Sequence, residues 1–160
     1  MTVTLDIRHR EPHFAVAVHA CLVIVVWDRR ILPADMRLIL PFERELAQRG
    51  AFAVLSVLRE GVDLGVDDKV REIGRQTLVE FADTQFASAL VVEGGGLRMI
   101  AIRSILTGIQ LLSRSAIKQR PFADVEAAVR WLAEQPEADA ALRERPDELI
   151  AAVQSLAAEF

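Results

Sequence analysis

The sequence predicts an α/β protein with a mixed β-sheet, an N-terminal hairpin and alternating helices, followed by a C-terminal helical extension. Strand-like and helix-period segments alternate from Ile31 to Gln135, an order typical of sheets that are covered by helices. Between these segments lie very few residues capable of covalent chemistry. We expect an α/β domain over residues 1–135 and a helical extension over residues 136–160 that packs on the same domain.

The N-terminal segments predict a hairpin. Val3, Leu5 and Ile7 alternate with polar residues, which favours a half-buried strand over residues 3–8. Residues 14–27 form a longer β-rich stretch, either one bent strand or two strands that meet near His19. We expect these segments to enter the sheet together.

The first helix is predicted over residues 33–48. Pro33 suits the first helical position, and Gly50 suits the residue at which a helix ends. Pro41 lies inside this helix and should kink or restart it. Residues 51–58 follow as a strand without charge, which favours a central place in the sheet.

The second helix should begin at Asp67, the best N-cap in its loop. Its apolar stripe runs from Val70 to Phe81. A short buried strand over residues 87–92 then precedes a loop of three glycines.

The helix predicted over residues 97–113 is apolar on more than one side. We expect its inward stripe to consist of Leu97, Ile100, Ala101, Ile105, Gly108 and Leu112. Further apolar residues, Met99, Ile102, Leu106 and Ile109, would then form an exposed surface, which usually marks an interface. Either a second copy of the chain or the C-terminal helix over residues 146–158 would cover it.

The last part of the domain predicts an edge strand over residues 116–120 that Pro121 ends, followed by a helix capped by Asp124. A final helix begins at Pro146.

Composition limits the function classes. The formal net charge of −4 argues against nucleic acid as a main partner, because binding phosphates requires a basic face. The longest apolar run covers residues 20–27, far below the roughly 20 residues of a membrane span, and we expect neither a transmembrane segment nor a signal peptide. The lone Cys21 suits a reducing cytosol, so we expect a cytoplasmic protein.

The order of elements resembles the STAS fold, and more closely the SpoIIAA-like bacterial proteins. The resemblance depends on Trp27 before Pro33, and on Pro121-Phe122 followed by Ala128, Trp131 and Leu132. It covers residues 3–135. It implies a non-enzymatic regulatory module that docks protein partners.

Some STAS domains are switched by phosphorylation of a hydroxyl at the start of the second main helix. The matching stretch, residues 62–68, contains no serine or threonine, so this mechanism is not carried over. Asp67 or Asp68 would imitate a permanently phosphorylated state at this switch position. An ordinary N-cap explains the same residues and is the favoured interpretation.

Gly94, Gly95 and Gly96 form the one loop that could cradle an anion before a helix, with Arg98 as counter-charge. The loop matches no nucleotide-binding motif, and a tight turn that needs positive φ explains it better.

Metal and catalytic sites are not expected. His13 and His19 are about 20 Å apart if they lie on one strand, and His19 with Cys21 supplies too few ligands. The acidic loop of Glu60, Asp63, Asp67 and Asp68 lacks a positioned partner, and no serine adjoins a histidine.

We therefore expect a non-enzymatic interaction module without a cofactor, self-associating as a homodimer. The alternative is a domain for a small apolar ligand or lipid, with a cleft between helix 97–113 and the sheet. An enzyme that uses the acidic loop with a metal is a third, less favoured hypothesis.

Overall fold

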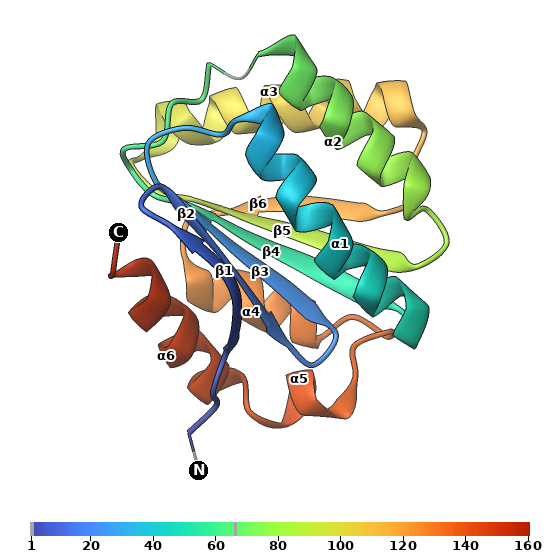
Figure 1. The fold of residues 1–160 in the computed structure, drawn as a ribbon, viewed down its shortest axis with the longest axis vertical. Helices are drawn as coiled ribbons and strands as arrows, with labels where there is room; N and C mark the ends of the chain where they lie inside the picture. The colour runs from blue at the N-terminus through green and yellow to red at the C-terminus, as the bar shows by residue number, and fades with distance from the viewer. Residues whose placement is uncertain (1, 66) are drawn as a thin grey trace.

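The computed structural model describes residues 2–65 and 67–160, which form one sheet covered by helices (Figure 1). The strands are β1 (Asp6–Glu11), β2 (Phe14–His19), β3 (Leu22–Trp27), β4 (Phe52–Leu58), β5 (Gln85–Val92) and β6 (Lys118–Phe122). The helices are α1 (Pro33–Arg49), α2 (Asp68–Glu80), α3 (Gly96–Ser113), α4 (Val125–Ala133), α5 (Ala140–Glu144) and α6 (Pro146–Ala157). The α/β class predicted from the sequence is confirmed.

The six strands lie in chain order across the sheet. β1, β2 and β3 pair antiparallel, whereas β3, β4, β5 and β6 pair parallel. The sheet is therefore mixed, and the carboxyl ends of its four parallel strands share one edge. Parallel neighbours need a crossover, and the helices between them supply it.

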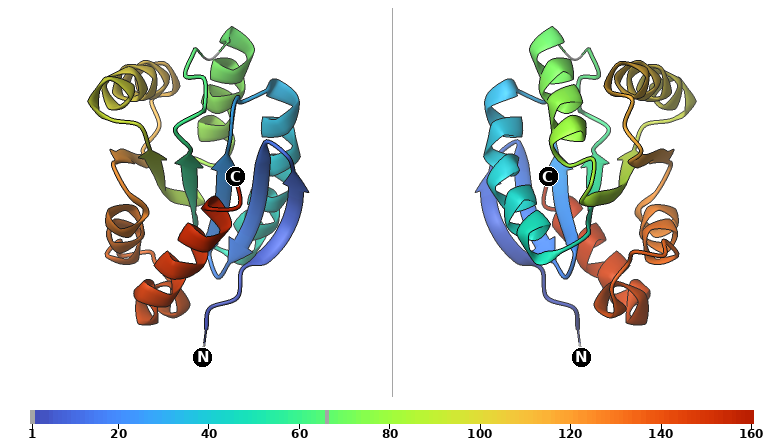
Figure 2. Two further views of the ribbon diagram at one scale, coloured as in Figure 1. Left: turned by 90° about the vertical axis from the view of Figure 1, so that its left-hand side faces the viewer. Right: turned by 90° about the vertical axis from the view of Figure 1, so that its right-hand side faces the viewer.

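Helices cover both faces of the sheet (Figure 2). α1, α2 and α3 lie on one face, and α4 and α6 lie on the other. Two separate apolar clusters result, one on each side of the strands. None of the helices in the described part of the chain combines the length and the hydrophobicity that a bilayer span requires.

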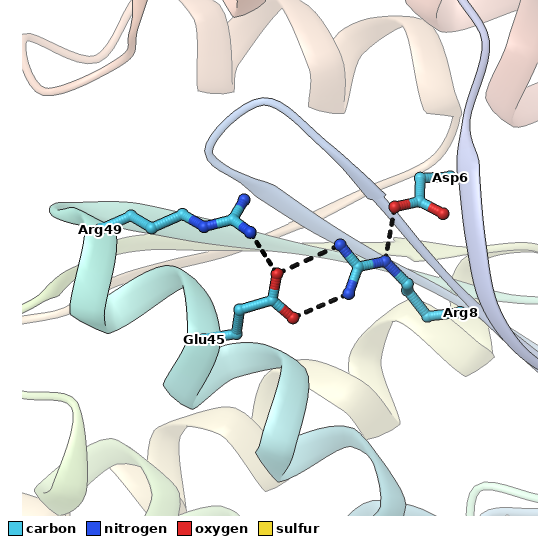
Figure 3. A network of polar contacts seen from close by, with 4 residues as sticks. All are labelled: Asp6, Arg8, Glu45 and Arg49. Atoms are coloured by element: carbon cyan, nitrogen blue, oxygen red, sulfur yellow. Dashed lines mark hydrogen bonds and ion pairs between the residues drawn. The ribbon is translucent and has the colours of Figure 1, made fainter.

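The N-terminal hairpins differ from the prediction in their bounds. β1 covers residues 6–11 instead of 3–8, because only these residues pair with β2. Val3 is buried although it lies outside the strand. Residues 14–27 form two strands, with Ala20 in the turn at a φ of 53°. Figure 3 shows how Arg8 of β1 binds Glu45 of α1, at 2.7 Å, and so ties the edge strand to the helix layer.

The end signals of the helices are confirmed. Pro33 occupies the first turn of α1, and Gly50 follows its last residue. The Asp67 side chain accepts a hydrogen bond from the backbone N–H of Val70 at 2.9 Å, as an N-cap does. Asp124 caps α4 in the same way.

The prediction for the last strand is wrong in its bounds. β6 extends over residues 118–122, so Pro121 lies within it and does not end it. A proline is tolerated there because β6 is an edge strand, with one side free of ladder hydrogen bonds.

The C-terminal extension packs against α4 and the sheet, on the face opposite α3. Leu149, Val153 and Leu156 of α6 belong to the same buried cluster as Leu132 of α4. The extension therefore does not cover α3, which excludes one of the two explanations for the apolar surface of that helix.

Candidate ligand-binding cavity

A cavity of about 200 Å³ lies between the sheet and the helix layer of α1, α2 and α3. Its lining is mostly apolar, and a few polar side chains are set into it. Such a composition is typical of small-molecule sites.

The floor of the cavity contains two serines in the middle of central strands. Ser56 of β4 and Ser88 of β5 face the helix layer and are only half-buried, although their strand neighbours are fully buried. Ser88 lies opposite Gln119 of β6, so polar groups continue toward the sheet edge. The other face of β4 and β5 is apolar throughout, with alanine, valine and leucine under α4. Polar residues thus occur where the sheet meets the cavity.

The roof near α1 consists of Met36, Ile39 and Glu43, which share one face of the helix at spacings of three and four. Glu43 is 6% exposed, a rare place for a carboxyl group. Burial, reinforced by the charge of Glu80 on α2, raises the pKa of Glu43 to about 8. The carboxyl is therefore mostly neutral at pH 7.

The opposite part of the roof comes from α3, and here the predicted orientation is wrong. Met99, Ile102, Leu106 and Ile109 face the sheet, and Ile102 is 4% exposed. Ile102, Leu106 and Ile109 line the cavity, and Met99 packs partly buried against the same apolar cluster. These residues therefore do not form an exposed interface. Most of the stripe that we expected to face inward is turned outward, with Leu97 86% and Leu112 74% exposed, whereas Ile105 of that stripe lines the cavity.

Arg98 explains this rotation. Its guanidinium donates to the backbone carbonyls of Glu93 at 2.7 Å, Val62 at 2.8 Å and Arg59 at 3.1 Å. Ile102 follows four residues later on the same face of the helix, so anchoring Arg98 at the strand ends turns Ile102 toward the sheet. Both stripes of α3 are apolar, and for this reason hydrophobic periodicity did not choose between them.

The guanidinium of Arg98 donates to three backbone carbonyls, so it does not supply the positive charge that the predicted anion site required. Gly94 and Gly95 have φ angles of 98° and 101°, so both need the left-handed region that favours glycine. A Cβ at Gly94 would also lie 2.6 Å from Cδ of Arg98. The glycines are therefore explained by the turn that lets Arg98 reach back.

The cavity adjoins a groove on the outside of α2 and α3. Arg71, Ile105 and Ile109 line both the cavity and an adjoining groove on the outside of these helices. Arg71 is exposed and stands at the rim. The groove continues over Asp68, Glu72 and Arg75.

The two aspartates proposed as a switch position have different surroundings. Asp67 serves as the N-cap of α2, and Asp68 is exposed in the first helical turn. Asp63 accepts a hydrogen bond from Gly65 N–H within its own loop. Within the described chain, the oxygens of this acidic loop do not come together as a group of metal ligands.

His13, His19 and Cys21 do not form a site. His13 lies at one end of β2, and the other two residues lie at its far end. Burial lowers the pKa of His19 and raises the pKa of Cys21, as expected of partly covered strand residues.

A cluster that the sequence did not reveal joins His13 to Glu11 and Asp35. Nε2 of His13 lies 2.7 Å from Oδ2 of Asp35, and Nδ1 lies 3.7 Å from Oε2 of Glu11. Ligand atoms of the three residues lie close enough to hold a cation. However, each ring nitrogen faces a different carboxylate, which suits a clamp between the hairpin and the buried Asp35 of α1. No feature of the local sequence predicts this contact, because His13 and Asp35 are 22 residues apart in the chain.

Comparison with known proteins gives no match for this chain among family models, curated proteins or solved structures. The functional argument therefore depends on the cavity and on the surfaces described above.

Proposed function

We propose that this protein is a non-enzymatic binding module that holds a small, largely apolar molecule in the cavity beneath α1, α2 and α3. The observation that carries this proposal is an apolar cavity of about 200 Å³ with the buried carboxyl of Glu43 in its wall. An engineered apolar cavity of roughly 150 Å³ is large enough to bind benzene, so a volume of this order accommodates a small organic molecule.

The lining favours binding over catalysis. Ser56 and Ser88 are the hydroxyls in the floor of the cavity, and no hydrogen bond links either of them to a histidine in the described part of the chain. A serine nucleophile needs such a base to become reactive.

The small buried part of α3 supports ligand entry at this helix. Ile102 is the one fully buried residue of this helix, all of whose residues are described. Grooves adjoin α3 on both sides, toward α2 and toward β6. A helix with a single fully buried side chain and grooves on both sides belongs to the less stable elements of a fold, from which binding regions are drawn.

A cavity-filling substitution tests the proposal. Ser88→Leu places a larger apolar side chain on the cavity floor, whereas Ser88→Ala removes the hydroxyl and keeps the space. A neutral probe of suitable size is 2-phenylethanol. We expect it to raise the melting temperature of the original protein and of Ser88→Ala, but not that of Ser88→Leu. Equal shifts in all three proteins would contradict a site in this cavity.

A second candidate function is self-association through the outer face of α3. Leu97, Ile100, Leu111 and Leu112 are 86%, 64%, 73% and 74% exposed, and all lie on this one helix. Exposed apolar groups of this kind usually mark an interface. We propose a homodimer through this face, which differs from the residues expected from the sequence.

Light scattering after size exclusion tests the dimer. Leu112→Glu should convert a dimer to a monomer, whereas Leu38→Glu, at an exposed leucine of α1, should not. A monomeric parent protein would remove this candidate and leave the cavity proposal intact.

We also propose the STAS-like relationship and a regulatory role in the cytoplasm. The strand order and the α/β layers support the relationship. Phe122 and Trp131, two residues that carry the resemblance, have ring centroids 5.4 Å apart. The lone Cys21 supports the location, since it suits a reducing compartment.

A further inference from the structure

Two buried amide oxygens belong to residues that line the cavity and have no hydrogen-bond partner among the described residues. The hydroxyl of Thr77 donates to the carbonyl of Ile73 at 2.7 Å, and Nε2 of Gln85 donates to the carbonyl of Ala87 at 3.3 Å. Oε1 of Gln85 and Oε1 of Gln119 have no hydrogen-bond partner among the described residues. A ligand that pairs with either of these oxygens must bring a donor.

Glu43 lines the same cavity, and in its ionised form its carboxylate only accepts hydrogen bonds. Its carboxyl makes no hydrogen bond with any other described residue, although it is 6% exposed and lines the cavity. The adjacent Arg44 does not neutralise it, because Arg44 pairs with Glu80 outside the cavity at 2.6 Å. A buried polar group without a partner destabilises the fold, and a ligand that pairs with it recovers that loss.

Charge then restricts the ligand further. Arg71, at the exposed rim, is the cation among the lining residues of the described chain. A carboxylate ligand would add a further negative charge near Glu80 and would repel Glu43 wherever that carboxyl is ionised. An ammonium group would instead form an ion pair of no net charge with the Glu43 carboxylate. Glu43 is 6% exposed, and taking two opposite charges out of water is favourable only when they are in close contact.

From these observations we propose that the cavity binds a small organic amine as its ammonium ion, with Glu43 as counter-charge and the hydrocarbon part between Ser88 of the floor and Ile102 of the roof. This assignment of ligand class rests on the proposed function. The volume of about 200 Å³ suits an aromatic ring with a short chain, since roughly 150 Å³ holds benzene alone.

Binding of an amine should release a proton from Glu43, whereas binding of a neutral ligand should not. The pKa of Glu43 is raised to about 8, with Glu80 and Arg44 as its charged neighbours, so the carboxyl is mostly protonated at pH 7. Pairing with ammonium requires the carboxylate, and binding at pH 7 therefore releases close to one proton from Glu43. The affinity for the amine should rise roughly tenfold per pH unit below pH 7 and level off above the pKa of Glu43.

Isothermal titration calorimetry with three ligands of similar size tests the proposal: 2-phenylethylamine, 2-phenylethanol and phenylacetate. At pH 8 we expect the amine to bind about tenfold more tightly than the alcohol, as hydrogen bonds to charged groups allow, and phenylacetate to bind most weakly. Titrations at pH 7 in two buffers of different ionisation enthalpy should show the proton release for the amine alone.

Glu43→Gln keeps the shape of the side chain and removes the charge. It should abolish the preference for the amine and the proton release while retaining the alcohol. Glu45→Gln, two residues along the same helix and outside the cavity, should retain the preference for the amine and the proton release. Equal binding of amine and alcohol, or a preference that survives Glu43→Gln, would overturn the amine assignment and leave the cavity proposal standing. If none of the three ligands binds, both proposals fail.

Discussion

Replacing Glu43 with glutamine should make the stability of this protein much less sensitive to pH. In the folded protein the pKa of Glu43 is about 8, against an ordinary value of 4.5. The unfolded chain therefore loses this proton first as the pH rises, and unfolding becomes easier between those two values. The stabilising effect of the neutral carboxyl is fully present below pH 4.5 and is lost as the pH approaches 8.

The magnitude follows from the two pKa values. Each pH unit between them corresponds to about 1.4 kcal/mol, so the full effect is about 5 kcal/mol, of which roughly 4 kcal/mol falls between pH 5 and pH 9. For a domain of this size, that difference corresponds to a change in melting temperature of roughly 10 °C. Because Glu43 is 6% exposed, solvent screening reduces this figure little.

The assay is urea denaturation, followed by circular dichroism at several pH values from 5 to 9, for the parent protein and for Glu43→Gln. The parent should lose stability with rising pH, and the variant should lose much less. Glu45→Gln is the matched control. The hydrogen bond that Arg8 donates to Glu45 lowers the pKa of that carboxyl below its ordinary value, so Glu45 does not titrate between pH 5 and pH 9. If Glu43→Gln shows the same slope as the parent, Glu43 does not titrate in a buried site and the reasoning fails.

Two further predictions concern anchors of the helix layer. Arg98→Ala removes three hydrogen bonds to carbonyls and should lower the free energy of unfolding by about 2–4 kcal/mol in urea, whereas the exposed Arg103→Ala should change it by less than about 0.5 kcal/mol. Equal effects would show that Arg98 does not hold α3. Asp67→Ala should cost about 1 kcal/mol through loss of the N-cap, and Asp68→Ala clearly less, by the same measurement. A larger loss for Asp68 would mean that this residue has a structural role beyond the first turn.

The sequence allowed the helix ends and the strand–helix alternation to be predicted, because these depend on local chemistry. Asp67 caps α2 through a hydrogen bond to a residue three positions away, and the positive φ angles at Gly94 and Gly95 depend on the absence of a side chain. The ends of β1 and β6 were less predictable. A strand ends where its neighbour stops pairing with it, and the neighbour's position is not a local property.

The candidate site was predicted only in outline. The sequence placed a ligand cleft between residues 97–113 and the sheet as an alternative, but it did not single out Glu43, Ser56 or Ser88. Glu43 lies on the same helical face as Met36 and Ile39, and this was the signal that could have revealed a buried acid.

Local sequence alone determined the class of this fold, the places where its helices start and stop, and the two apolar stripes of α3. Only the tertiary structure decided which stripe faces the sheet, on which side the C-terminal helix packs, and that Glu43 is enclosed without a hydrogen-bonding partner among the described residues. The physical reason is that periodicity fixes which residues share a face. The direction of that face depends on long-range contacts, such as those of Arg98 with the carbonyls of Arg59 and Val62.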